Sequence, residues 1–141
     1  MISALEHQKV FKSIVYRRNG LSEQVIERLY PLLTRRPPQH LVELKFIDCN
    51  MTGSQVALLC DTLTCADSRL RTLALVYAQQ TDRSFSRMIS WLKDSQYIRN
   101  IDLSSTQMCT SSQGWPKLIE VVKEHNSLRS VNISHNRLME D

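Results

Sequence analysis

A short frame of apolar residues recurs five times along this chain at nearly constant spacing. Its clearest copy fits the pattern L-x-x-L-x-L-x-x-C/N-x-L with Leu41, Leu44, Phe46, Cys49 and Met51. Copies begin at positions 11, 41, 70, 98 and 128, so successive starts lie 30, 29, 28 and 30 residues apart. One match to so loose a pattern means little, but five matches at this spacing indicate a repeat protein.

The frame is the strand-and-turn half of a leucine-rich repeat, and 28 to 30 residues leave room for a full helix after each strand. The predicted fold is therefore an α/β, right-handed βα leucine-rich repeat solenoid. A parallel sheet lines its concave side and helices cover its convex side. Residues 1–10 are expected to form an N-terminal cap segment. Residues 11–141 form the repeats, the last of which is incomplete.

Apolar residues at helical spacing follow each frame. The expected N-caps are Ser22 for the first helix, Thr52 or Ser54 for the second, Thr81 or Asp82 for the third, and Ser111 or Ser112 for the fourth. Pro31 is expected to kink or shorten the first helix, because proline lacks the backbone N–H that a helix interior needs.

Composition and cysteine spacing exclude several classes of function. No apolar run approaches the roughly 18 residues that span a bilayer, so direct membrane insertion is not expected. The four cysteines form no C-x-x-C pair, and no histidine lies at metal-ligand spacing, so we expect no metal or cofactor. Cys49 fills the turn position of its frame. Free thiols suit a reducing compartment, and the predicted location is cytoplasmic.

The charge pattern does not favour nucleic acid. The net charge is +4, and the arginines that dominate the basic residues are scattered along the chain. A nucleic-acid surface needs them gathered on one face with aromatic residues for stacking. Solvated loops and helix faces are the preferred interpretation, and no nucleic-acid partner is expected.

Strand residues alternate between faces, so the concave surface follows from the frame. Its predicted positions are Ser13, Val15, Arg17, Glu43, Lys45, Ile47, Thr72, Ala74, Val76, Asn100, Asp102, Ser104, Ser130, Asn132 and Ser134.

Apolar residues on this wet face suggest a protein contact. Ile47, Val76 and the neighbouring Tyr77 are apolar or aromatic, and Arg17 and Lys45 flank them. Asp102 belongs to the more acidic, hydroxyl-rich C-terminal part. These six residues are the candidate partner-binding site, although an ordinary solvated surface is an equally open interpretation.

Catalysis is not expected. Asp102 beside Ser104 has no histidine on a neighbouring central position, so the face lacks a convergent set of nucleophile, base and orienting group.

Resemblances to two groups of known proteins suggest a cellular context for this chain. Cys49-Asn50-Met51-Thr52 followed by Leu59 to Leu63 resembles the long repeats of ribonuclease inhibitor and of NOD-like receptors. The run of Ala4 to His7, Leu21 to Val25 and Asp102 to Thr106 resembles the first repeats of the CARMIL family. CARMIL proteins are cytosolic actin regulators that act on capping protein through a segment beyond their repeats, and no part of this chain matches that segment. The resemblance implies a domain type and an actin- or membrane-linked setting.

The sequence thus predicts a non-catalytic protein–protein interaction module, a fragment of a larger cytosolic regulator or scaffold. The alternative is the repeat region of a NOD-like-receptor or ribonuclease-inhibitor-like protein. A RanGAP-type GTPase-activating protein is a third reading, supported only by Asn136-Arg137-Leu138. Because Val131, Ile133 and Leu138 have no repeat after them, further repeats or another chain are expected to cover that end.

Overall fold

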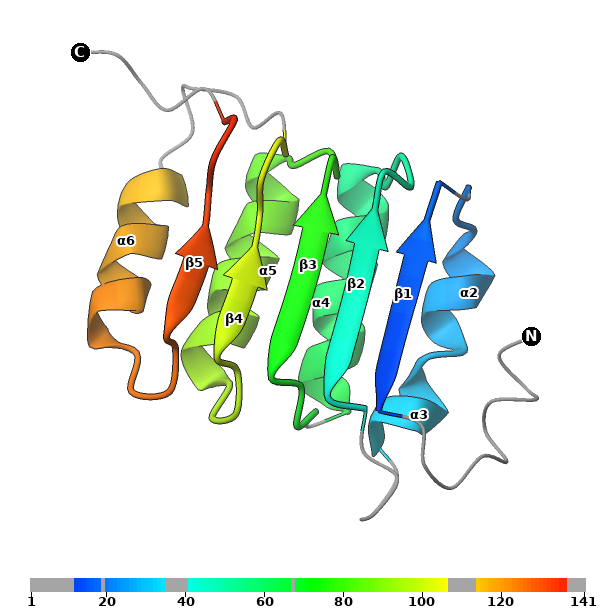
Figure 1. Cartoon of the computed structure of the whole chain (residues 1–141), viewed down its shortest axis with the longest axis horizontal. Helices are drawn as coiled ribbons and strands as arrows, with labels where there is room; N and C mark the ends of the chain where they lie inside the picture. The colour runs from blue at the N-terminus through cyan, green and yellow to red at the C-terminus, as the bar shows by residue number, and fades with distance from the viewer. Residues whose placement is uncertain (1–11, 19, 35–40, 67, 107–113, 137–141) are drawn as a thin grey trace.

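The computed structural model describes residues 12–18, 20–34, 41–66, 68–106 and 114–136. These residues form two layers, a five-stranded parallel sheet and a row of helices that covers one of its faces (Figure 1). The strands are β1 (Ser13–Arg17), β2 (Glu43–Ile47), β3 (Thr72–Val76), β4 (Asn100–Asp102) and β5 (Ser130–Asn132). The helices are α2 (Glu23–Glu27), α3 (Tyr30–Thr34), α4 (Gly53–Cys65), α5 (Asp82–Asp94) and α6 (Gly114–Glu124). The predicted α/β repeat solenoid is confirmed.

Equivalent residues of successive repeats lie side by side. The strand order follows the chain, β1-β2-β3-β4-β5, and the register pairs Ser13, Glu43, Thr72, Asn100 and Ser130 in turn. Each strand begins two residues after the start of its frame. As a result, any one position of the repeat forms a straight row across the sheet.

Alternation along the strands separates a core from an open face. Leu44, Phe46, Leu73 and Leu75 point between the layers, where each is essentially inaccessible to solvent. Together with inward residues of the helices they form one continuous apolar cluster. The face predicted to be concave is the one that no described helix covers, and we call it the open face (Figure 1).

Two of the predicted helix caps are made and one is not. Thr52 caps α4 and Thr81 caps α5, each in a reciprocal capping box with the residue three positions on, Gln55 or Ser84. Ser22 occupies the N-cap position of α2 with an extended backbone, but its side chain makes no capping hydrogen bond. That part of the prediction is wrong, because cap geometry depends on the side-chain rotamer as well as on the residue type.

The stretch expected to form the first helix is two short helices instead. α2 ends at Glu27 and α3 begins at Tyr30, which places Pro31 in the first turn of α3. Proline is tolerated there because the N–H groups of a first turn have no partner within the helix. Residues 1–11, Cys109, Ser111, Ser112 and Leu138 lie outside the described residues.

Candidate functional site on the open face

Four of the six predicted contact residues meet at one end of the first three strands. Arg17, Ile47 and Val76 are register partners, so they lie next to one another on β1, β2 and β3. Tyr77 follows Val76 directly and is 52% exposed. Ile47 and Val76 are partly exposed although they are aliphatic. We call Arg17, Ile47, Val76 and Tyr77 the apolar row.

The other two predicted residues lie in the neighbouring row of the sheet. Lys45 and Asp102 are both paired with Ala74, one from each side, so a whole strand separates them. Ala74, which is small and buried, lies between this cationic and this anionic side chain. Val15 belongs to this row as the partner of Lys45 and is 44% exposed. Val15 is predicted on this face but is not one of the six predicted contact residues.

Hydrogen bonds within the protein engage both carboxylate oxygens of Asp102. Oδ1 accepts from the backbone N–H of Ser104 at 2.9 Å, and Oδ2 accepts from the side-chain amide of Asn132 at 3.3 Å. Asn132 repeats the first of these bonds with the N–H of Ser134 at 3.0 Å. Asp102 is therefore oriented by its own repeat and the next, and it lies apart from the apolar row.

Lys45 has an acidic partner on its own strand. Its ammonium lies 3.2 Å from a carboxylate oxygen of Glu43, and the hydroxyl of Ser13 donates to the same oxygen at 3.1 Å. All three side chains are on the open face. Ion pairs between partly exposed side chains on a surface contribute little to stability, so Lys45 stays available to a partner.

Five residues with left-handed backbone conformation form a column across the sheet, at the strand ends beside the apolar row. Arg18, Asp48, Tyr77, Ser105 and His135 occupy the same position in successive repeats, and each has φ between 53° and 61°. Each costs about 1–2 kcal/mol relative to right-handed backbone. None of them is glycine, and only Asp48 and His135 are of residue types enriched in this conformation, so the residue types give a weak signal.

Backbone hydrogen bonds between successive repeats hold residues of this column in place. The N–H of Arg18 donates to the carbonyl of Ile47, that of Asp48 to Val76, and that of Tyr77 to Ser104, at 3.1 to 3.3 Å. For Tyr77 the consequence is a bulky aromatic ring held at the rim of the open face by the backbone of the next repeat.

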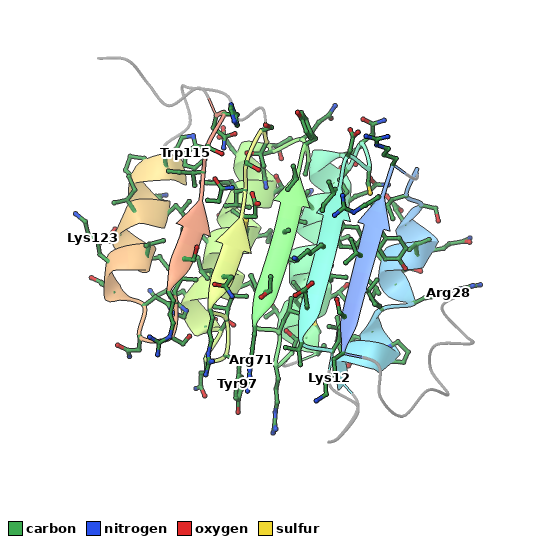
Figure 2. All side chains as sticks on the ribbon, in the orientation of Figure 1. Lys12, Arg28, Arg71, Tyr97, Trp115 and Lys123 are labelled. Atoms are coloured by element: carbon green, nitrogen blue, oxygen red, sulfur yellow. The ribbon has the colours of Figure 1, made fainter. Side chains whose placement is uncertain are left out.

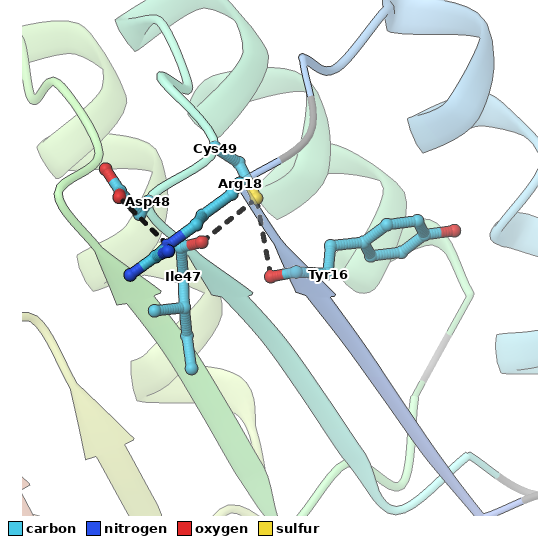
Figure 3. A network of polar contacts seen from close by, with 5 residues as sticks. All are labelled: Tyr16, Arg18, Ile47, Asp48 and Cys49. Carbon is cyan, nitrogen blue, oxygen red and sulfur yellow. Dashed lines mark hydrogen bonds and ion pairs between the residues drawn. The ribbon is translucent and has the colours of Figure 1, made fainter.

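Cys49 joins the ends of β1 and β2 behind the apolar row (Figure 3). Its thiol lies 3.4 Å from the carbonyl oxygens of both Tyr16 and Ile47, which share its single S–H as acceptors. The predicted structural role of this turn cysteine is confirmed. Figure 3 also shows the exposed ion pair of Arg18 with Asp48, whose Nε and Oδ2 are 4.0 Å apart.

Tyr16 supports the same corner from the helix side of the sheet. Its ring stacks on that of Phe46 with centroids 5.2 Å apart and planes 2° from parallel. Burial, and secondarily the nearby Cys49, raises the pKa of the Tyr16 phenol. Tyr16 directly precedes Arg17, and Phe46 directly precedes Ile47. The stacked rings on the helix side of the sheet therefore support the two residues on the open face.

Metal binding finds no support in the part of the chain that the structure describes. It contains no group of three or more His, Cys, Asp or Glu residues arranged to hold a metal ion. None of the described helices is long and apolar enough to cross a membrane.

Comparisons with known proteins agree with the fold. No protein-family model matches the chain. The mouse "NACHT, LRR and PYD domains-containing protein 4E" is 27% identical over 117 residues, which is 83% of this chain and 12% of that protein. Among solved structures, the tropomodulin C-terminal domain of Caenorhabditis elegans superposes with a TM-score of 0.74 at 19% identity. That match covers 94% of this chain and 80% of the other. The chain thus has a fold of the leucine-rich repeat type.

Proposed function

We propose that this domain binds a protein partner on its open face and catalyses no reaction. The observation that carries the proposal is the apolar row, in which Ile47 and Val76 lie in register beside Arg17 and end at the exposed ring of Tyr77. Interface cores are enriched in aromatic residues, methionine and arginine and are depleted of other charges. The apolar row combines two such residue types with two partly exposed aliphatic side chains.

Charged residues surround the row in the way that a polar rim surrounds an interface core. Lys45 and Glu43 lie on one side of it, and Arg18 and Asp48 lie at the strand ends. Both signs are present, so the rim favours a partner with mixed charge over a uniformly charged one. The left-handed backbone at Tyr77 presents the ring at a cost in stability, as is common at binding sites.

A double variant tests the apolar row. Ile47→Ser with Val76→Ser is expected to weaken partner capture by about tenfold or more, because truncated hot-spot residues cost about 2 kcal/mol or more of binding energy. The melting curve should hardly move. The matched control is Ser13→Ala with Ser130→Ala, which also alters two open-face positions but lies at the other end of the strands. Affinity capture from cytosol with quantitative mass spectrometry, scored for actin-capping components, supplies the readout.

A second comparison checks the assignment of faces. Leu44→Ala or Leu73→Ala removes a side chain packed between the layers and is expected to destabilise the fold by ~2–5 kcal/mol. If Ile47→Ser with Val76→Ser destabilises the fold as much, the two residues belong to the core and the proposed contact surface is wrong. If capture is unchanged in a stable double variant, the partner binds elsewhere.

The proposed setting is a larger cytosolic regulator linked to actin or membranes, as the resemblance to the CARMIL repeats implies. The similarity to the tropomodulin domain is compatible with this setting and concerns the fold alone. The second candidate is the repeat region of a NOD-like receptor, which the 27% identity with the mouse protein favours. The complete gene sequence discriminates them. A nucleotide-binding module supports the second setting, whereas a preceding membrane-binding module and a following capping-protein motif support the first.

The side of β5 that faces away from β4, which no element of the described residues covers, is a separate expected contact. Val131 and Ile133 are partly exposed there, and Ile119 on α6 is largely exposed. We propose that further repeats or another chain cover this side. Sedimentation tests the idea, because an uncovered side is expected to give concentration-dependent association of the 141-residue chain. A stable monomer at high concentration contradicts it.

A further inference from the structure

A row of basic residues lies where the strands begin, at the opposite end from the apolar row. One repeat position, directly before the first strand residue, is occupied by Lys12, Val42, Arg71, Arg99 and Arg129. The N–H of each donates to the carbonyl of the one before it, and all four bonds measure 2.8 Å. Hydrogen-bonded neighbours of this kind are about 4.8 Å apart. The backbone therefore holds three arginines on neighbouring strands in a straight line. Lys12 continues this line beyond Val42, two strands from Arg71.

These side chains extend into solvent on one side of the molecule. Lys12, Arg71, Arg99 and Arg129 are all exposed. Figure 2 shows Lys12 and Arg71 projecting beyond the starts of the strands, with Tyr97 at the same edge. We call these four residues, together with Arg69, the basic edge. Arg69 belongs to it because its guanidinium carbon lies 5.5 Å from the ring centroid of Tyr97, which is 41% exposed.

No acidic side chain forms an ion pair with a residue of the basic edge within the described residues, although Asp94 lines the same pocket as Arg69 and Tyr97. The ion pairs of the described residues involve Arg18, Lys45 and Arg87. The acidic residues at the nearby helix ends, Asp94 and Glu124, take part in none of these pairs either. Like charges on neighbouring strands repel one another and destabilise a sheet. The arrangement becomes favourable when an external anion faces it.

The shape of the basic edge decides which anion fits. Its strand-start members lie at one level of the sheet, and the exposed ring of Tyr97 lies against the guanidinium of Arg69. Peptide recognition needs pockets for alternate side chains, and single-stranded nucleic acid needs several aromatic rings for stacking. A flat anionic surface needs only cations at one level, and an interfacial aromatic residue adds to the contact. We infer that the basic edge docks this domain onto the surface of an anionic phospholipid membrane, without insertion.

The inference is independent of the open-face proposal, because the two surfaces lie at opposite ends of the strands. Each basic residue close to an anionic membrane increases partitioning about fivefold, and three of them together about 100-fold. Arg71→Gln, Arg99→Gln and Arg129→Gln combined should therefore lose about 100-fold in binding to anionic vesicles. The fold should remain intact, since the substitutions also remove repulsion between neighbours.

Co-sedimentation with vesicles tests the inference on the 141-residue chain. The probes are phosphatidylcholine vesicles with and without phosphatidylserine, at low and physiological salt. The matched control is Arg28→Gln with Arg83→Gln and Lys117→Gln, three exposed positions on or next to helices that lower the net charge equally. Wild type and control are expected to bind the phosphatidylserine vesicles alike, with affinity that falls as salt rises. The Arg71/Arg99/Arg129 variant should stay in the supernatant with an unchanged circular dichroism spectrum.

Several results would overturn the inference. Equal binding of wild type to neutral and anionic vesicles removes the electrostatic contact. Equal loss in both triple variants assigns the effect to net charge and not to the basic edge. Binding of polyglutamate or single-stranded DNA, abolished by the same arginine substitutions and without vesicle binding, assigns the edge to another anion.

Discussion

Gly53 lies at a close approach between two repeats and offers a sharp test of their packing. It is the first residue of α4, and a Cβ placed on it would lie 2.5 Å from Cγ2 and 3.0 Å from Oγ1 of Thr81, the N-cap of α5. Thr81 cannot simply rotate away, because its Oγ1 accepts the capping hydrogen bond from the N–H of Ser84 at 3.2 Å. Gly53→Ala is therefore expected to disturb the cap of the neighbouring helix.

Two opposing effects set the magnitude. Alanine is favoured over glycine inside a helix by about 1 kcal/mol. The gain is smaller at the first position, where the N–H has no partner in the helix. Overpacking costs about 1–3 kcal/mol, and loss of a threonine cap costs about 1 kcal/mol. Steric overlap should win, so that Gly53→Ala lowers stability by about 1–3 kcal/mol. In a domain of this size that is a fall of about 3–10 °C in Tm.

A double-mutant cycle identifies the cause. Thr81→Ser removes Cγ2 but keeps the capping hydroxyl, so Gly53→Ala should cost less in the Thr81→Ser background, by about 1 kcal/mol or more. The four proteins are compared by urea and thermal unfolding followed by circular dichroism. Gly20→Ala is the matched control, because nothing lies within 4 Å of a Cβ at that position. If Gly53→Ala behaves like Gly20→Ala, or if the two substitutions add without coupling, the reasoning about this junction is refuted.

Three further predictions concern thiols and the partly buried amide of Asn136. Native alkylation should modify the exposed Cys65 and spare the buried Cys49 and Cys60, as checked by peptide mass spectrometry. Equal rates at Cys60 and Cys65 would contradict the packing of α4. Burial, and secondarily Asp61, raises the pKa of the Cys60 thiol from 9.0 to about 12. Because the unfolded chain loses this proton first, stability should fall above about pH 9, by up to ~1.4 kcal/mol per pH unit. Cys60→Ala should flatten that slope, and an unchanged slope refutes the assignment. The side-chain oxygen of Asn136 accepts from the backbone N–H of Thr106 at 2.8 Å and from its hydroxyl at 2.9 Å. Asn136→Ala should cost about 1–3 kcal/mol in urea unfolding, because it leaves buried donors unpaired. A neutral result would mean that water replaces the amide.

The repeat frame by itself determined the class of fold and the face of each strand residue. A period of two places Leu44 and Phe46 on one side and Lys45 and Ile47 on the other, whatever the neighbouring strands do. A constant repeat length then requires each strand to align with the next. The role of Cys49 followed as well, because the turn position of the frame accepts a small hydrogen-bonding side chain.

Local features that depend on backbone or rotamer detail were not accessible to the same reasoning. Ser22 has the right residue type for a cap but makes no capping bond. The left-handed backbone of Arg18 and Tyr77 is not signalled by their residue types, and it accompanies hydrogen bonds from their N–H groups to the next repeat. Such bonds join residues about one repeat apart in the chain, so they exist only once the strands have paired.

Tertiary structure alone decided which side chains act together. Arg71, Arg99 and Arg129 look like isolated charges along the chain, yet parallel pairing puts their backbones in direct hydrogen-bond contact. A signal was present, because a basic residue follows the first frame position in four of five copies, but its meaning depends on the register. Asp102 shows the opposite case, since the next strand engages its carboxylate with Asn132 and sets it apart from the apolar row. The period of two along a strand determines which face of the sheet a side chain lies on. Its neighbours on that face belong to strands about 30 residues away in the chain, so they are determined by the pairing of the strands.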